Sequence, residues 1–290
     1  MTKINSIVLS LITENKYSLY FSFFRIFIAI LLLKKLLLQW TLISLLYTGK
    51  SYLIPTNSTV SEFFISFNTD FIRSQIYIFL GLYFLLLLFF LFGIGKNITA
   101  IALFLFYDVL QKLCPQILNG GDNYMRFILL YFCFANSFDY LTLGKYKINK
   151  FSEINKLFTN LAGLSICIHL CLIYFISAIH KIHTDVWFNG IATYYTFNIE
   201  RFNGTHINNY ISKNYFFVTL STYGTWLIEL LYPVLIWFKE TKKIMIVLVI
   251  ILHIGIAIFM MLYDFQLLFI FVQGFFISNE SWLKFYSTLK

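Results

Sequence analysis

The fold is decided by an uninterrupted apolar stretch, residues 157–180, which reads LFTNLAGLSICIHLCLIYFISAIH. It contains no Asp, Glu, Lys or Arg, and a helix needs only ~20 mostly apolar residues to cross a bilayer. Other stretches resemble it, although several are shorter. The eight expected spans are residues 17–47, 75–92, 98–113, 124–138, 157–180, 216–238, 244–262 and 265–278. We therefore expect an all-α, polytopic transmembrane helical bundle of about eight spans, within a range of seven to nine, of which one or two short ones are tilted, re-entrant or only partly spanning.

The composition supports this class. Of the 290 residues, 59% are apolar and 12% are charged, whereas a soluble domain has roughly 45–50% apolar and about 25% charged residues. The values argue against a soluble enzyme and against a disordered chain. No soluble domain is expected, so residues 1–290 should form a single transmembrane domain. The four cysteines show neither metal-ligand spacing nor a disulfide framework.

The net charge of +9 is attributed to lysines that orient the chain in the bilayer and meet anionic lipid, and nucleic acid is not an expected partner. Two turns between spans are rich in lysine, and both read as cytoplasmic. They carry Lys145, Lys147, Lys150 and Lys156 in the first turn and Lys239, Lys242 and Lys243 in the second. Counting outward places both termini in the cytoplasm and the loops 50–74, 114–123 and 181–215 outside, in a multi-pass protein of the cell inner (plasma) membrane.

Ionisable residues inside spans cost free energy, about 2.5–3.5 kcal/mol each on insertion scales, so each needs a reason. Arg25 in the first span is either a snorkelling or carbonyl-bonded structural residue, or a substrate contact. Lys34 and Lys35 project 100° apart on a helix, so we expect one to reach a cavity while the other snorkels.

Asp122 and Arg126 stand four positions apart at the start of the fourth span, an order that suits a salt bridge and the helix dipole. An ordinary helix cap explains much of this pattern. Gly120 and Gly121 are expected to turn the backbone before the helix, and Asp108 on the preceding span is expected near the same level.

Glu229 and His253 each lie ten residues from the Lys239–Lys243 turn, which places both about 15 Å from it. A direct hydrogen bond between the two side chains is expected, because it would lower the cost of burying both. Such a contact would serve either as a structural clasp or as part of a proton or substrate relay.

The outer end of the fifth span is the richest segment. One face carries Cys167, Cys171, Tyr174, Ala178 and Lys181 at helical spacing, so Lys181 should sit at the end of an inward face. An apolar site disfavours the charged form of lysine, which makes a neutral amine available as a base.

Two other interpretations of this segment stay open. Lys181 and Trp187 would also suit an anchor at the membrane interface. The spacing of His180, His183 and Asp185 is weak evidence for a metal, and no metal is expected.

These residues resemble a known family. The stretch Tyr174-Phe175 to Lys181, Trp187, Gly190 and Ala192 looks like the signature of the HTTM (horizontally transferred transmembrane) family, which includes vitamin K-dependent gamma-carboxylase. Three other pieces are similar and in the same order. They are Phe24-Arg25-Ile26, Gly120-Gly121-Asp122, and Glu229-Leu-Leu-Tyr-Pro233 followed by His253 and Phe265.

The resemblance implies roles. Lys181 matches the base that deprotonates vitamin K hydroquinone in the carboxylase, so a reduced quinone is the implied cofactor. Asp122 falls where the carboxylase has a functional His, and this departure from the family pattern argues against true carboxylation. A second departure is that the carboxylase's large lumenal C-terminal region has no counterpart in this sequence. The size is similar to the short bacterial SdpB-type branch, whose members resemble maturation factors for secreted toxin peptides.

The resulting hypothesis is a bacterial membrane protein that modifies or matures an exported peptide at the outer side of the membrane. The partners would be the bilayer, a secreted peptide and the product of a neighbouring gene. Lys181, Asp122, His253 and Glu229 are the candidate catalytic residues, and Arg126, Tyr174, His180, Trp187 and Arg25 are candidates for substrate binding. The alternatives are a non-enzymatic maturation, scaffold or immunity factor on the same fold, and a small transporter.

Overall fold

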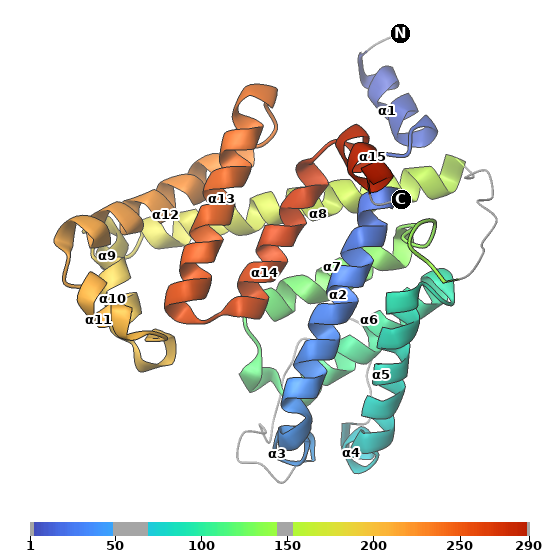
Figure 1. Cartoon of the computed structure of the whole chain (residues 1–290), viewed down its shortest axis with the longest axis horizontal. Coiled ribbons are helices and arrows are strands. Elements are labelled where there is room, and N and C mark those ends of the chain that lie inside the picture. The colour runs from blue at the N-terminus through green and yellow to red at the C-terminus, as the bar shows by residue number, and fades with distance from the viewer. Residues whose placement is uncertain (1–2, 49–68, 144–152, 289–290) are drawn as a thin grey trace. The chain divides into compact units, whose positions relative to one another are not determined.

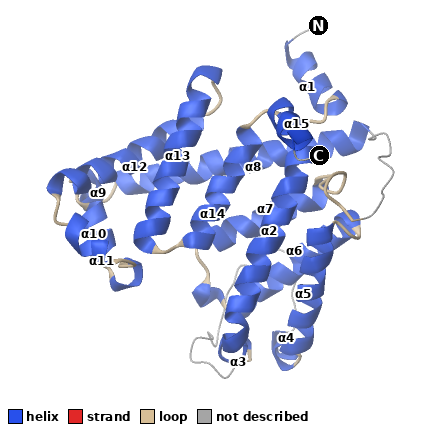
Figure 2. Cartoon of the chain, in the orientation of Figure 1, coloured by secondary structure: helices blue, strands red, loops and turns tan. Residues whose placement is uncertain are grey.

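The structure is a computed structural model that describes residues 3–48, 69–143 and 153–288 (Figure 1). Within these ranges the chain forms helices, turns and loops, and no strand occurs (Figure 2). The all-α prediction is confirmed for the part of the chain that is described.

The chain divides into two compact units. Unit 1 comprises Met1–Gly163 and Ser278–Lys290, and unit 2 comprises Leu164–Ile277. The long helix α8, Glu153–Ile182, contributes residues to both. The expectation of one domain over residues 1–290 stays a prediction.

Unit 1 is built on a chain of helix-to-helix contacts. Helix α2 packs against α5, α5 against α6 and α6 against α7, while α15 packs against α2. The elements besides the first part of α8 are α1 Lys3–Thr13, α2 Ser18–Gln39, η1 Trp40–Leu42, α3 Ile43–Tyr47, α4 Thr69–Ser74, α5 Ile76–Phe92, α6 Lys96–Leu113, η2 Pro115–Ile117, α7 Gly120–Phe134 and α15 Asn279–Thr288.

The core of unit 1 is aromatic. The ring of Phe132 on α7 lies 5.3 Å from Phe21 and 6.0 Å from Phe24 on α2, and 5.2 Å from Phe90 on α5, between centroids. All four rings are buried. Such pairs add favourable contact geometry to the burial of apolar area, so they fix α2, α5 and α7 together.

Unit 2 contains the rest of α8 and the elements that follow. Helix α12 packs against α13 and α10, and α13 packs against α14. The elements are α9 Asp185–Phe188, α10 Ala192–Asn198, η3 Glu200–Phe202, α11 His206–Ile211, α12 Tyr215–Leu235, α13 Lys239–Met260, α14 Tyr263–Val272 and η4 Gln273–Phe276.

Among the described residues, three helical stretches are long and apolar enough to cross a membrane. They are Ser18–Tyr47, Glu153–Ile182 and Lys239–Met260, and the shorter Ile76–Phe92 and Tyr263–Phe276 are also apolar. Each of the eight predicted spans overlaps a helix, although the number of spans stays a prediction. The first stretch continues as helix through Lys34 and Lys35 and changes to a 3-10 turn only at η1.

The fourth predicted span, 124–138, has the wrong boundaries. Helix α7 begins at Gly120 because Asn119 caps it, and residues 135–143 are not helical. Gly120 and Gly121 therefore form the first helical turn instead of a tight turn before it, and neither has a positive φ. The capping signal of Asn119 outweighed the turn signal of the two glycines.

The expected outer loop 181–215 folds in large part into the short helices α9, α10 and α11. The lysines Lys145, Lys147 and Lys150, and residues 50–68 of the first outer loop, lie outside the described residues. The orientation inferred from them stays a prediction.

Candidate functional site

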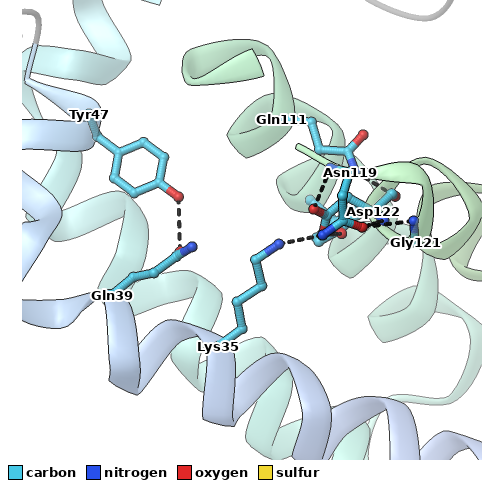
Figure 3. Close-up of polar contacts among 8 residues, drawn as sticks. Lys35, Gln39, Tyr47, Gln111, Asn119, Gly121 and Asp122 are labelled. Carbon is cyan, nitrogen blue, oxygen red and sulfur yellow. Dashed lines mark hydrogen bonds and ion pairs between the residues drawn. The ribbon is translucent and has the colours of Figure 1, made fainter. Parts of the chain in front are cut away.

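The structure places six of the nine candidate residues in two groups, one within each unit. The Asp122 cluster, in unit 1, consists of Lys35, Tyr107, Gln111, Asn119 and Asp122 (Figure 3). The second group lies in unit 2 and contains an ion pair and a hydrogen-bonded triad, described below.

Asp122 is buried and its carboxylate is fully engaged. One oxygen, Oδ1, pairs with the ammonium group of Lys35 and accepts a hydrogen bond from the hydroxyl of Tyr107 at 3.2 Å. The other, Oδ2, accepts from the backbone N–H of Asn119 at 3.1 Å, and together with the Asn119 side chain this completes a capping box. The helix cap and the buried ion pair are thus made by the same residue.

The predicted Asp122–Arg126 salt bridge is wrong. Arg126 lies 3.5 Å from Asp108 on α6, and Asp108 also pairs with Lys112 at 3.1 Å. Asp122 forms its ion pair with Lys35 on α2. Asp122 and Arg126 thus each pair with a residue of another helix instead of with each other. The position of Asp108 beside Arg126 agrees with the level expected for it on the preceding span.

A cavity of about 40 Å³ adjoins the Asp122 cluster. This volume holds about three water molecules at ~10–15 Å³ each. Its polar lining includes Lys35, Gln39, Tyr47, Tyr107 and Gln111, and its remaining walls are mainly leucine. Within the described chain, the buried Oε1 atom of Gln111 has no hydrogen-bond partner.

The two adjacent lysines of α2 separate as predicted. Lys35 reaches the cavity and Asp122, and Lys34 is exposed. The sequence predicts a role in a cavity for one of the two lysines but gives no reason to choose Lys35, and sequence reasoning missed Tyr107 and Gln111. The spacing of these two residues, one helical turn apart at the polar end of the third predicted span, was the signal available.

Arg25 occupies a carbonyl cage inside unit 1. Its side chain is fully buried, and its guanidinium donates to the carbonyls of Ser137 at 3.0 Å, Leu91 at 2.8 Å and Leu141 at 2.7 Å, as well as to Phe90. Of the roles considered from sequence, these contacts support the carbonyl-bonded structural one. A contact of Arg25 with substrate stays an untested prediction.

In unit 2, Lys181 at the end of α8 forms an ion pair with Glu229 of α12. The ammonium group also lies 4.6 Å from the ring centroid of Trp187, a cation–π contact. The side chains of Lys181 and Glu229 are 19% and 9% exposed, so the pair is largely withdrawn from solvent. Among the described residues, Oε2 of Glu229 finds no hydrogen-bond partner.

A second set of contacts lies two turns back along α8. The hydroxyl of Tyr174 is 2.6 Å from Nε2 of His253 on α13, and Nδ1 of His253 bonds to Oε1 of Gln266 on α14. We call Tyr174, His253 and Gln266 the Tyr174 triad. All three residues are buried.

The predicted hydrogen bond between Glu229 and His253 is wrong, although both side chains are buried. Each is bonded to α8 instead, Glu229 to Lys181 and His253 to Tyr174. The predicted inward face of α8 is confirmed, since Cys167, Cys171, Tyr174 and Ala178 are buried. That face supplies an ammonium group, a better partner for a buried carboxylate than an imidazole is.

His180 is exposed, and its side chain makes no hydrogen bond or ion pair with the described residues, so it belongs to neither group. His183 bonds its Nδ1 to the carbonyl of Ile179 at 2.7 Å. Over the described ranges, no group of three or more His, Cys, Asp or Glu side chains is placed to hold a metal ion. Sequence reasoning missed Gln266, whose position one residue after Phe265 carried no signal of its own.

Comparisons with models of protein families, with curated proteins and with solved structures find no match for this chain.

Proposed function

We propose that this chain is a polytopic membrane protein of the HTTM type, with about eight spans and both termini in the cytoplasm. Its task would be to modify or mature an exported peptide at the outer side of the membrane, with a reduced quinone as cosubstrate. The support for membrane insertion is the three long apolar helices and the overlap of every predicted span with a helix.

The observation that carries the proposed activity is the contact between Lys181 and Glu229. These residues belong to two motifs of the family resemblance and stand 48 positions apart in the chain. Trp187, from the same motif as Lys181, completes the group. Two motifs that converge in one largely buried group favour a common chemical task.

The Lys181–Glu229 pair would supply a cation beside a carboxylate that retains one unpartnered oxygen. The ammonium can stabilise negative charge that develops on a substrate. Oε2 of Glu229 can accept a hydrogen bond from a donor group of the same substrate. In an environment of low dielectric constant both effects are stronger than in water.

The test is oxidation of vitamin K hydroquinone by the purified chain in proteoliposomes, with dissolved dioxygen supplied as the oxidant that takes up the two electrons and two protons of the quinol. We expect wild-type protein to oxidise the quinol, and Lys181→Ala and Lys181→Arg to lose this activity at normal membrane levels. Arg keeps the charge but spreads it over a larger planar group, so it cannot place the cation where the compact ammonium of Lys181 lies. A matched control is Lys213→Ala, at an exposed lysine of the same unit. If wild-type protein does not oxidise the quinol, the proposed carboxylase-like reaction is wrong.

A cellular test separates the non-enzymatic alternative. If the peptide phenotype survives Lys181→Ala but is lost on substitutions in the helix core, a scaffold or immunity role replaces the enzymatic one. The orientation is tested by thiol labelling of cysteines placed at Lys156, Lys242 and Lys213. We expect only the cysteine at position 213 to react from the outside.

A further inference from the structure

The Tyr174 triad has the connectivity of an activated hydroxyl group. The phenol oxygen of Tyr174 lies 2.6 Å from Nε2 of His253, and the other ring nitrogen bonds to Oε1 of Gln266. The exposed fractions of the three residues are 3%, 5% and 1%, so no bulk water competes for these bonds.

The partners assign the proton positions. An amide oxygen only accepts hydrogen bonds, so Nδ1 of His253 must carry the proton that bonds to Oε1 of Gln266. In a neutral imidazole the other nitrogen is then an acceptor, and Nε2 receives the phenolic proton of Tyr174. A neutral ring also avoids placing an isolated charge among apolar helices.

A hydroxyl on an imidazole that is oriented by a third group is the general arrangement for activating that hydroxyl. We propose that Tyr174 is a proton acceptor of the unit 2 site, that His253 takes over its proton, and that Gln266 is the positioning residue that fixes the His253 tautomer. This inference rests on the proposed function for the identity of the substrate, but not for the geometry of the triad.

The proton transfer balances without an electron donor or acceptor. An acidic X–H group of the substrate gives its proton to the Tyr174 oxygen while the phenolic proton moves to Nε2 of His253. The X–H bond breaks, an N–H bond forms on the imidazole, and Tyr174 is again a neutral phenol. The products are the substrate anion and an imidazolium whose Nδ1–H remains on Gln266.

The position of the triad suits the neighbouring ion pair. Tyr174 and Lys181 lie on the same face of α8, seven residues or about 10.5 Å apart along the axis, with the small buried Ala178 between them. Lys181 is engaged as a cation by Glu229, so its role would be to stabilise the substrate anion. The ammonium group of Lys181 is already protonated and cannot accept a proton, so the Tyr174 triad would supply the proton acceptor.

The first test reads the tautomer directly and needs no activity. The full chain is labelled with ¹⁵N-histidine in detergent micelles, and the His253 signals are assigned by their loss in His253→Gln. We expect a protonated Nδ1 and an unprotonated Nε2 in wild-type protein. Gln266→Met, which has no amide oxygen, should give a mixture of tautomers, and Gln266→Glu should restore the single form. The inference is overturned if His253 of the wild-type protein carries its proton on Nε2 or is an imidazolium. It is also overturned if the His253 signals are unchanged in Gln266→Met.

The second test uses the quinol assay. We expect Tyr174→Phe to lower the rate of quinol oxidation at least ~100-fold, the usual worth of a general base. In Gln266→Met the rate of quinol oxidation should fall by about tenfold, and in Gln266→Glu the rate should return toward the wild-type value. If wild-type protein oxidises the quinol and Tyr174→Phe is equally active, the relay is wrong while the proposed function stands. If wild-type protein is inactive but the tautomers are as expected, the proposed function fails and the triad geometry stands.

Discussion

Nη2 of Arg25 donates a hydrogen bond of 2.7 Å to the carbonyl of Leu141, a residue held in the left-handed region at φ 55°. A non-glycine residue in that region is strained by about 1–2 kcal/mol. The bond to Arg25 offsets this strain, because the turn at Leu141 aims a carbonyl at Nη2, whose other bond, to the carbonyl of Tyr140, is longer at 3.4 Å. The same guanidinium bonds to carbonyls at the end of α5, so it fastens α2 to two other segments.

The first prediction concerns this cage. Arg25→Met should destabilise the fold by roughly 3–5 kcal/mol, because several buried carbonyls lose their donor at once. Arg25→Lys should recover only part of the loss, since an ammonium cannot reproduce the planar fork. Denaturant unfolding of the protein in detergent measures both. A loss below ~1 kcal/mol for Arg25→Met would show that the cage is not structural.

The second prediction concerns the Lys181–Glu229 pair. Lys181→Met and Glu229→Gln should each destabilise the fold by about 3 kcal/mol, since each leaves one group largely buried without its partner. The double variant should lose less than the sum, with a coupling free energy of at least ~1 kcal/mol. Strict additivity in the double-mutant cycle would mean that the two groups do not interact.

The third prediction uses two adjacent lysines as a matched pair. Lys35→Met removes the partner of the buried Asp122 carboxylate and should cost about 3 kcal/mol. Lys34→Met, one residue away and exposed, should stay within ~0.5 kcal/mol of wild type. Thermal unfolding of the two variants in the same detergent gives the comparison, and equal losses would contradict the assignment of Lys35 to the cavity.

The fourth prediction concerns pH. Asp139 lies outside the predicted spans and accepts a hydrogen bond from Ser18 at 2.9 Å, yet burial raises the pKa of its carboxyl above the usual value. The folded chain therefore binds this proton more tightly than the unfolded chain does. The stability contributed by this group is greatest below the unfolded pKa of about 4 and falls as the pH rises through the folded pKa.

Asp139→Asn removes that titration. We expect the variant to be more stable than wild type at pH 7 and to show a flatter dependence of unfolding temperature on pH between about 4 and 7. An Asn oxygen can still accept from Ser18, so the hydrogen bond is a constant in the comparison. If the variant is less stable than wild type at pH 7, folding does not raise the pKa of Asp139.

The sequence predicted the helical class well because the signal is strong and local. Residues 157–180 contain no Asp, Glu, Lys or Arg, the run is long enough to cross a bilayer as a helix, and it lies within α8. The inward face of α8 followed from helical spacing alone. The start of α7 was misplaced because the Asn119 cap and the two glycines give opposing local signals, and the capping box decided between them.

The partners of the polar residues could not be predicted in the same way. Asp122 and Arg126 are near each other on one helix, yet each pairs with a residue of another helix. Glu229 and His253 stand at matched positions in a hairpin, yet α8 provides a partner for each.

By itself the sequence determined the all-α class of the described residues, the approximate positions of most apolar helices and the inward face that ends at Lys181. Only the tertiary structure decided that Lys181 meets Glu229, that Lys35 meets Asp122 and that Gln266 orients His253. Helix formation depends on neighbours along the chain, whereas the partner of a buried charge depends on which helix faces it, at distances that no spacing in the sequence records.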